Sequence, residues 1–200
     1  MMKVKIKKDS KTEEFKLISS WADVTLETWL KLIEFKGGSK AEEATETLEA
    51  LSNIPKQLIE QLSLRDVALI MGRVSELQAT TNSSFKRIVE IEGIEYGFHP
   101  NLDDITLGEY ADLEQFIKVG LEENLANVMA VLYRPVVEKK NEVYTIEAYG
   151  EGFQIRAEQM KKMSAEQVQS ALVFFYNLGK ILWMISQSYL MEMQKEMKTQ

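Results

Sequence analysis

Two periods of hydrophobic and polar residues divide the chain into β-hairpins and helices. Val4 and Ile6 alternate with lysines and residues 13–18 alternate similarly, a period of two that predicts a β-hairpin over residues 2–18. A second hairpin is predicted at residues 88–98, around the turn residues Glu92-Gly93. Elsewhere apolar residues recur every three or four positions, the period of amphipathic helices. Helices are predicted over residues 25–36, 39–52, 64–78, 106–119, 122–133, 153–162 and 165–197, with a short one after Pro55.

The best-defined helix start lies at Thr106. Its side chain can accept a hydrogen bond from the amide of Glu109, and the Glu109 carboxylate can reach back to the Thr106 amide, which is a capping box. Ser39 and Ser63 predict caps for two earlier helices. After Thr106, apolar residues at helical spacing define one face of the helix: Leu107, Tyr110, Leu113, Phe116 and Ile117.

The region around Thr106 resembles a stretch near the N-terminus. Asp23-Val-Thr-Leu26 matches Asp104-Ile-Thr-Leu107 at an offset of 81 residues, and Trp29 matches Tyr110 at the same offset. Further matches follow in the same order, at an offset of 80 over the next helix and at 101 from residue 59 onward. The alternative is that capped amphipathic helices look alike without a common origin.

We therefore predict an α+β, predominantly helical fold, built from two tandem β-hairpin-plus-helices units that arose by internal duplication. The first unit spans residues 1–80 and the second spans residues 85–200, separated by a small, polar segment at 79–84. The second unit carries an insertion at 136–152, with charged residues at 138–142 and a strand at 143–149. It ends in a long C-terminal helix.

Composition narrows the function. The net charge of −7 argues against general nucleic-acid binding, which rests on cationic contacts to phosphates. The lysines of the first hairpin are expected to charge an exposed strand edge rather than to bind phosphate. Without cysteine the chain has no disulfides or thiolate chemistry. No signal peptide or membrane-spanning run is recognised, so a cytoplasmic protein is expected.

No motif for a catalytic, cofactor or metal site is recognised. His99 is the only histidine and is expected to be a turn residue. Asp103-Asp104 would suit a metal ion or an acid–base pair. Because Asp104 has a counterpart in Asp23 before the same capped threonine, favourable charge at a helix start explains it more simply. We therefore expect a protein that is not an enzyme and holds no cofactor.

A partner-binding surface is predicted in the C-terminal helix, which carries more apolar residues than one neighbouring helix covers. Methionine side chains suit adaptable contact surfaces, although Met184 fits a core equally well. Arg134 is expected to pair with an acid or a helix-end carbonyl, or to contact a partner. The candidate partner-binding residues are Trp183, Leu190, Met191, Met193, Met197 and Arg134.

Three stretches carry a family resemblance: Asp104-Ile-Thr-Leu-Gly-Glu-Tyr-Ala-Asp-Leu-Glu114, Val131-Leu-Tyr-Arg-Pro135, and Phe174-Phe175 before an apolar helix. In these, the chain resembles small virion-assembly proteins of tailed bacteriophages, and tail assembly chaperones look closest. The resemblance covers roughly residues 94–190 and brings no family binding residues with it. It implies a non-enzymatic protein that holds the adhesive surfaces of other virion components during assembly.

The expected function is therefore a protein-binding phage assembly factor. Its partners would be other phage structural or assembly proteins, or further copies of this chain in a homo-oligomer, but neither nucleic acid nor membrane. It would act in the host cell cytoplasm or reside in the virion. Two alternatives stay open: a structural virion component such as a neck, connector or packaged internal protein, and an enzyme with unrecognised carboxylate chemistry at Asp103, Asp104 or Glu109.

Overall fold

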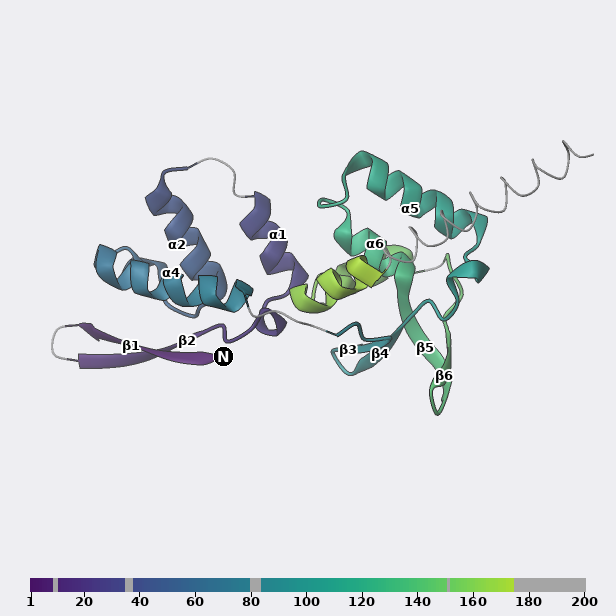
Figure 1. Cartoon of the computed structure of the whole chain (residues 1–200), viewed down its shortest axis with the longest axis horizontal. Helices are drawn as coiled ribbons and strands as arrows, with labels where there is room; N and C mark the ends of the chain where they lie inside the picture. The colour runs from purple at the N-terminus through teal and green to yellow at the C-terminus, as the bar shows by residue number, and fades with distance from the viewer. Residues whose placement is uncertain (9–10, 35–37, 80–83, 151, 175–200) are drawn as a thin grey trace, which may run out of the picture.

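The described part of the chain is a mixed α+β structure with two small antiparallel sheets. A computed structural model describes residues 1–8, 11–34, 38–79, 84–150 and 152–174. Two lobes lie side by side along the long axis, each with a sheet below and helices above in the view of Figure 1. The first lobe contains β1 to α4, and the second contains β3 to α7.

The first lobe begins with the predicted hairpin, β1 (Met2–Lys8) and β2 (Lys11–Leu17). A 3-10 turn, η1 (Trp21–Asp23), leads into α1 (Leu26–Glu34). Ser39 caps the next helix in a complete capping box with Glu42, as the Ser39 prediction required. The helices that follow are α2 (Lys40–Leu51), α3 (Lys56–Ile59) and α4 (Leu64–Ala79).

The second lobe repeats the order of hairpin, 3-10 turn and helices. Its hairpin is confirmed, and both turn residues have positive φ, 52° at Glu92 and 81° at Gly93, as a tight hairpin turn requires. A last described helix covers residues 165–174, the beginning of the predicted long C-terminal helix. The other elements are β3 (Ile88–Ile91), β4 (Ile94–Phe98), η2 (Leu102–Asp104), α5 (Leu107–Gly120), α6 (Leu125–Leu132), β5 (Tyr133–Lys140), β6 (Val143–Ile146) and α7 (Phe153–Met160).

The predicted insertion at 136–152 belongs to the sheet of the second lobe. β5 pairs with β4 and β6 pairs with β5, giving the strand order β3-β4-β5-β6. The strand predicted at 143–149 is present as the shorter β6, whereas the charged run 138–142 was not recognised as the end of β5, which continues to Lys140. Gly97 allows this packing: a Cβ at that position would lie 2.5 Å from the Tyr144 ring.

The two halves share backbone hydrogen bonds at fixed offsets. The amide of Ile18 donates to the carbonyl of Leu51 at 3.0 Å, and the amide of His99 donates to the carbonyl of Leu132 at 2.7 Å, both residues being 81 positions later. The predicted offset of 80 for the second helix of each half is therefore replaced by 81. The turns before the last described helix of each half correspond at 101: Leu62 to Ile59 and Met163 to Met160, both 3.0 Å. Duplication itself stays a prediction.

The hydrophobic cores of the two lobes are interlocked. Leu26, at the start of α1, is fully buried in the core of the second lobe, and Ala165 is fully buried in the core of the first. The amide of Leu26 donates to the carbonyl of Met163 at 2.7 Å, and the amide of Ala165 donates to Val24 at 2.8 Å. The start of α1 is thus held in the second lobe by both backbone and side chains.

Candidate interaction site

Most of the apolar face of α5 points outward. Leu107, Tyr110 and Ile117 are 84 %, 58 % and 47 % exposed. Of the five residues predicted to form one apolar face, only Leu113 is buried, and Phe116 is half-buried. Only one side of α5 contacts its lobe. The apolar residues cover a wider arc of the helix than that side, so some of them are exposed. Leu121, just beyond the helix, extends the exposed stripe at 37 %.

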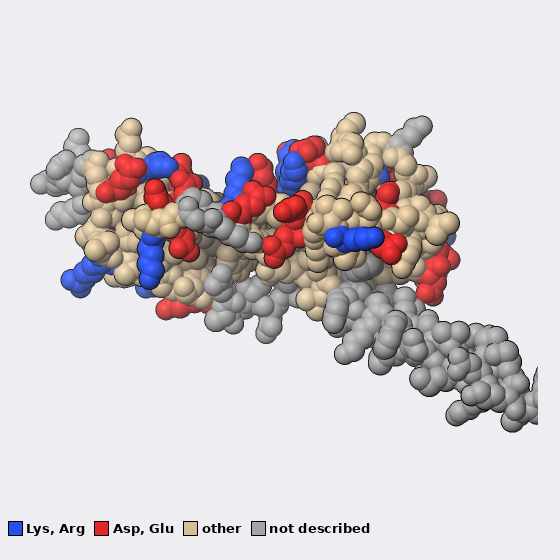
Figure 2. Space-filling view, turned by 90° about the horizontal axis from the view of Figure 1, so that it is seen from above, with Lys and Arg blue, Asp and Glu red and all other residues tan. Residues whose placement is uncertain are grey.

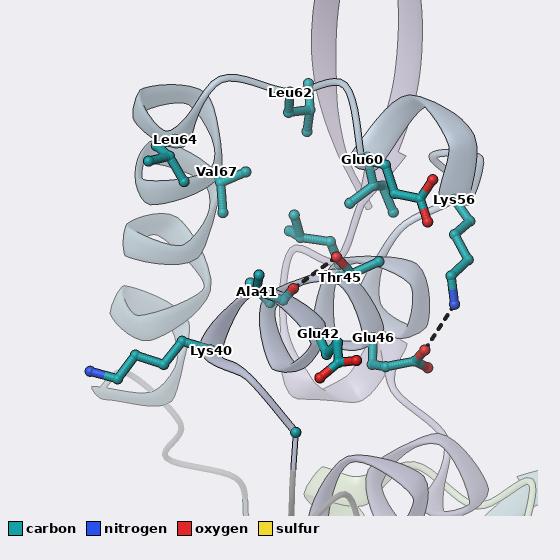
Figure 3. A pocket seen from close by; sticks show the side chains of 14 residues that line it. Lys40, Ala41, Glu42, Thr45, Glu46, Lys56, Glu60, Leu62, Leu64 and Val67 are labelled. Atoms are coloured by element: carbon teal, nitrogen blue, oxygen red, sulfur yellow. Dashed lines mark hydrogen bonds and ion pairs between the residues drawn. The ribbon is translucent and has the colours of Figure 1, made fainter.

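A hollow of about 870 Å³ lies between α2, α3 and α4 in the first lobe. Figure 3 shows side chains from all three helices converging on it, with Leu62 and Val67 on one side and Ala41 and Thr45 on another. Leu64, at the start of α4, is on its edge and is 87 % exposed. Its apolar lining residues are Ala41, Ala44, Leu48, Ile59, Leu62, Leu64 and Val67, and Thr45 also lines it.

The rim of this hollow is charged with both signs. Lys56 Nζ lies 3.0 Å from Glu46 Oε1, the ion pair drawn in Figure 3. Glu42 accepts from the Ser39 amide in the capping box, and the pKa of its carboxyl is lowered by that backbone hydrogen bond. Figure 2 shows acidic and basic side chains interspersed over one face of both lobes, with uncharged surface between them. An apolar hollow with a mixed rim suits a protein side chain better than a highly charged ligand.

A buried ion pair connects α5 with β5. Arg134 lies with one guanidinium nitrogen 2.7 Å from Glu109 Oε1, and the two side chains are 5 % and 1 % exposed. Glu109 also completes the predicted capping box, accepting from the Thr106 amide at 2.7 Å. The cap is predictable from the local sequence, whereas the pairing is not, because Arg134 lies 25 positions after Glu109. At an offset of 81 the first half has neutral residues, Thr28 and Asn53, at these positions.

The electrostatics of this cluster favour an ionised pair beside a neutral histidine. Burial raises the pKa of Glu109, but the hydrogen bonds from Thr106 and the charge of Arg134 outweigh it, so its pKa is lowered overall. Burial, followed by the charge of Arg134, lowers the pKa of His99. The Nε2 atom of His99 lies 3.8 Å from Glu109, and its buried Nδ1 has no hydrogen-bond partner within the described residues.

The carboxylates proposed for unfamiliar chemistry only partly converge. His99, Asp104 and Glu109 line one shallow depression next to β6, whereas Asp103 is not among its lining residues. Asp104 accepts a hydrogen bond from the Asn101 side chain at 2.9 Å, and Glu109 is committed to Arg134 and Thr106. These roles are structural. Among the described residues, no group of acids and His99 is arranged to hold a metal ion.

The predicted partner-binding residues have different outcomes. Arg134 pairs with an acid, one of its expected roles, and is 4 % exposed, while its contact with a partner stays a prediction. The other five, Trp183, Leu190, Met191, Met193 and Met197, lie outside the described residues. The exposed stripe of α5 and the hollow were not recognised as interaction surfaces from the sequence.

The described helices include none that is both long enough and apolar enough to cross a membrane. Comparison with known proteins finds no matching family model, no matching curated protein and no matching solved structure. The fold and these surfaces therefore define the class only as a mixed α+β protein with exposed apolar helix surface.

Proposed function

We propose that this chain is a non-enzymatic, protein-binding assembly factor, of the kind implied by its resemblance to tail assembly chaperones of tailed bacteriophages. The observation that carries the proposal is the exposed apolar stripe on α5: Leu107, Tyr110, Ile117 and Leu121. Single exposed apolar residues are ordinary on a protein surface. Four of them at intervals of three, seven and four lie on one side of α5 and just beyond its end, with the charged Glu114 between Tyr110 and Ile117. An exposed apolar stripe of this kind is typical of a docking site for protein.

The energetics of the stripe suit a reversible partner. Burying one exposed leucine or isoleucine side chain contributes roughly 1.5–3 kcal/mol. The exposed charged residues Glu114 and Lys118 lie on the same helix, and such polar neighbours keep a partner-binding surface soluble when unbound. The proposed partners are the apolar surfaces of other virion proteins before they assemble.

We further propose that the two halves are copies of one ancestral unit. The matched hydrogen bonds at offsets of 81 and 101 support this origin. Copies of one unit start with the same surfaces, so a charged cluster present in only one copy, such as Glu109 with Arg134, was acquired or lost after duplication.

Capture of partners from the protein's native context tests the proposed function. A tagged chain, an Ile117→Lys variant and an Ile155→Lys control are used as baits, and the captured proteins are identified by mass spectrometry. Ile155 is a matched control because it is 71 % exposed on another helix, α7, and receives the same substitution. Ile117→Lys is expected to lose virion proteins that the other two baits retain. If all three baits capture the same virion proteins, or none, α5 is not the binding surface. Presence in purified particles would favour the structural-component alternative.

A further inference from the structure

The contact that joins the two lobes has a characteristic geometry. The first turn of α1 enters the second lobe, where Leu26 is 0 % exposed. The amides of Leu26 and Glu27 donate to the carbonyls of Met163 and Lys161 at 2.7 and 2.9 Å. The core cluster that contains Leu26 includes these residues of the second lobe: Leu125, Ala126, Met129, Met160, Met163 and Val168.

Leu26 and Ala165, which are buried where the two lobes join, correspond in the other half of the chain to residues that are exposed. At an offset of 81, Leu26 corresponds to Leu107 on α5, which is 84 % exposed. At an offset of 101, Ala165 corresponds to Leu64 on α4, which is 87 % exposed. These are the two most exposed large apolar residues in the described part of the chain. Each half of the joining contact thus has a second, equivalent surface in the chain, at Leu107 and at Leu64, and these two equivalent residues are exposed.

The counterpart of the receiving site is the hollow in the first lobe. Counting back 81 positions from Leu125, Ala126 and Met129 gives Ala44, Thr45 and Leu48, and counting back 101 from Met160, Met163 and Val168 gives Ile59, Leu62 and Val67. All six of these residues line the hollow shown in Figure 3. In the second lobe the six equivalent residues belong to the same buried core cluster as Leu26, and one of them, Met163, accepts a hydrogen bond from the Leu26 amide.

The backbone repeats the same relation. The counterparts of the donors Leu26 and Glu27 are the amides of Leu107 and Gly108, at the start of α5, where helical amides have no intrahelical acceptor. The counterparts of the two acceptors are the carbonyls of Leu62 and Glu60. Within the described residues, the amides of Leu107 and Gly108 and the carbonyls of Glu60 and Leu62 make no backbone hydrogen bond to another element.

We propose that the first turn of α5 in one copy binds the α2–α3–α4 hollow of a second copy, reproducing between molecules the contact that joins the two lobes. This inference rests on the proposed function, since it assigns a partner to the Leu107–Tyr110 end of the same stripe. Tyr110 corresponds to Trp29, which packs against both cores. Because α5 lies on one lobe and the hollow on the other, the contact is head-to-tail and can continue into a ring or a filament (Figure 1).

Complementary full-length variants test the contact. Leu107→Lys disables the inserting turn and leaves the hollow intact, whereas Ala44→Arg obstructs the hollow and leaves α5 intact. Mass is measured by light scattering over a wide range of concentration. The unmodified chain is expected to exceed its 23.0 kDa monomer mass increasingly with concentration. Each variant alone is expected to stay monomeric, and an equimolar mixture is expected to stop at twice the monomer mass, since only one productive contact remains.

Controls separate this outcome from misfolding. Ala50→Arg makes the same substitution on the same helix, but Ala50 lies beside Lys31 and Leu32 of α1 and does not line the hollow. This variant is expected to assemble like the unmodified chain. Leu64→Lys, at a residue already 87 % exposed, provides a second hollow variant with no buried side chain disturbed. Circular dichroism checks the fold of each protein.

Three results would overturn the inference: an unmodified chain that stays at 23.0 kDa at its highest soluble concentration, variants that assemble like it, or a mixture that remains monomeric. If the chain is monomeric but Ile117→Lys still loses captured virion proteins, the inference fails and the proposed function stands. If both experiments are negative, both fail.

Discussion

The ion pair between Glu109 and Arg134 gives the most quantitative prediction. Arg134→Met removes the cation while filling similar volume, and so leaves a carboxylate that is 1 % exposed without its partner. Breaking a buried pair in this way costs about 3–5 kcal/mol. For a chain of 200 residues, each kcal/mol lowers the melting temperature by roughly 2–4 °C, so a fall of about 6–20 °C is expected.

A double-mutant cycle isolates the interaction. Glu109→Gln keeps an oxygen that can accept from the Thr106 amide, so it removes the charge with little effect on the helix cap. It is expected to destabilise by a similar amount, because it leaves Arg134 buried and unpaired. The double variant replaces the pair by two neutral side chains and is expected to be more stable than the summed losses predict, by at least about 2 kcal/mol.

The measurement is urea denaturation followed by circular dichroism, with a matched exposed pair as the control. Lys139 and Glu95 have the same separation, 2.7 Å, but are 41 % and 46 % exposed. The same substitutions there, Lys139→Met and Glu95→Gln, are expected to cost less than about 1 kcal/mol. If the Arg134 and Glu109 losses simply add, or if both pairs behave alike, burial does not determine the strength of this contact.

Three further predictions concern packing, protonation and the joining contact. Gly97→Ala is expected to destabilise the protein by about 1–3 kcal/mol, because the added Cβ would lie 2.5 Å from the Tyr144 ring. Gly72→Ala, in open space within α4, is expected to stabilise it by up to about 1 kcal/mol. Urea denaturation compares the free energies of unfolding of the two variants. Burial lowers the pKa of His99, so as the pH falls through the ordinary value of 6.5 the unfolded chain takes up the proton before the folded one does. The free energy of unfolding is therefore expected to fall with pH until the lower pKa of the folded protein is passed. Melting temperatures measured from pH 7.5 to 5 should decline less in a His99→Leu variant, and equal declines would contradict this role. Leu26→Ala is expected to cost about 2–5 kcal/mol and Leu107→Ala less than about 0.5 kcal/mol in the monomer, although the two residues correspond in sequence; similar losses would show that their environments do not differ.

Local features of the fold could be predicted from the sequence, because their causes are local. Ser39 and Thr106 cap helices through residues three positions later, and Glu92-Gly93 suits a tight turn whatever surrounds it. Whether an apolar stripe on a helix faces the core or the solvent depends on the elements that pack beside the helix, which the local sequence does not specify. Leu26 and Leu107 follow the same motif, yet one is buried and the other exposed.

The candidate site was less predictable for the same reason. Pairing of Glu109 with Arg134 depends on β5 running beside β4, and that strand was not recognised because its last residues belong to the charged run 138–142. The hollow in the first lobe lies between three consecutive helices, and the way these pack against one another is not given by the spacing of residues within any one of them. Correspondence between the halves was the one sequence signal that could have located it.

The interlocked cores have a consequence for synthesis on the ribosome. Leu26 reaches its buried position only against residues 161–165, so the N-terminal lobe remains incomplete until most of the polypeptide has been translated. At ~5–20 residues per second, the intervening stretch takes about 7–28 s to emerge. During that delay the start of α1, with Leu26, is exposed on the nascent chain. Neighbouring nascent chains on one messenger RNA could then exchange this segment, each inserting it into the second lobe of another chain instead of its own.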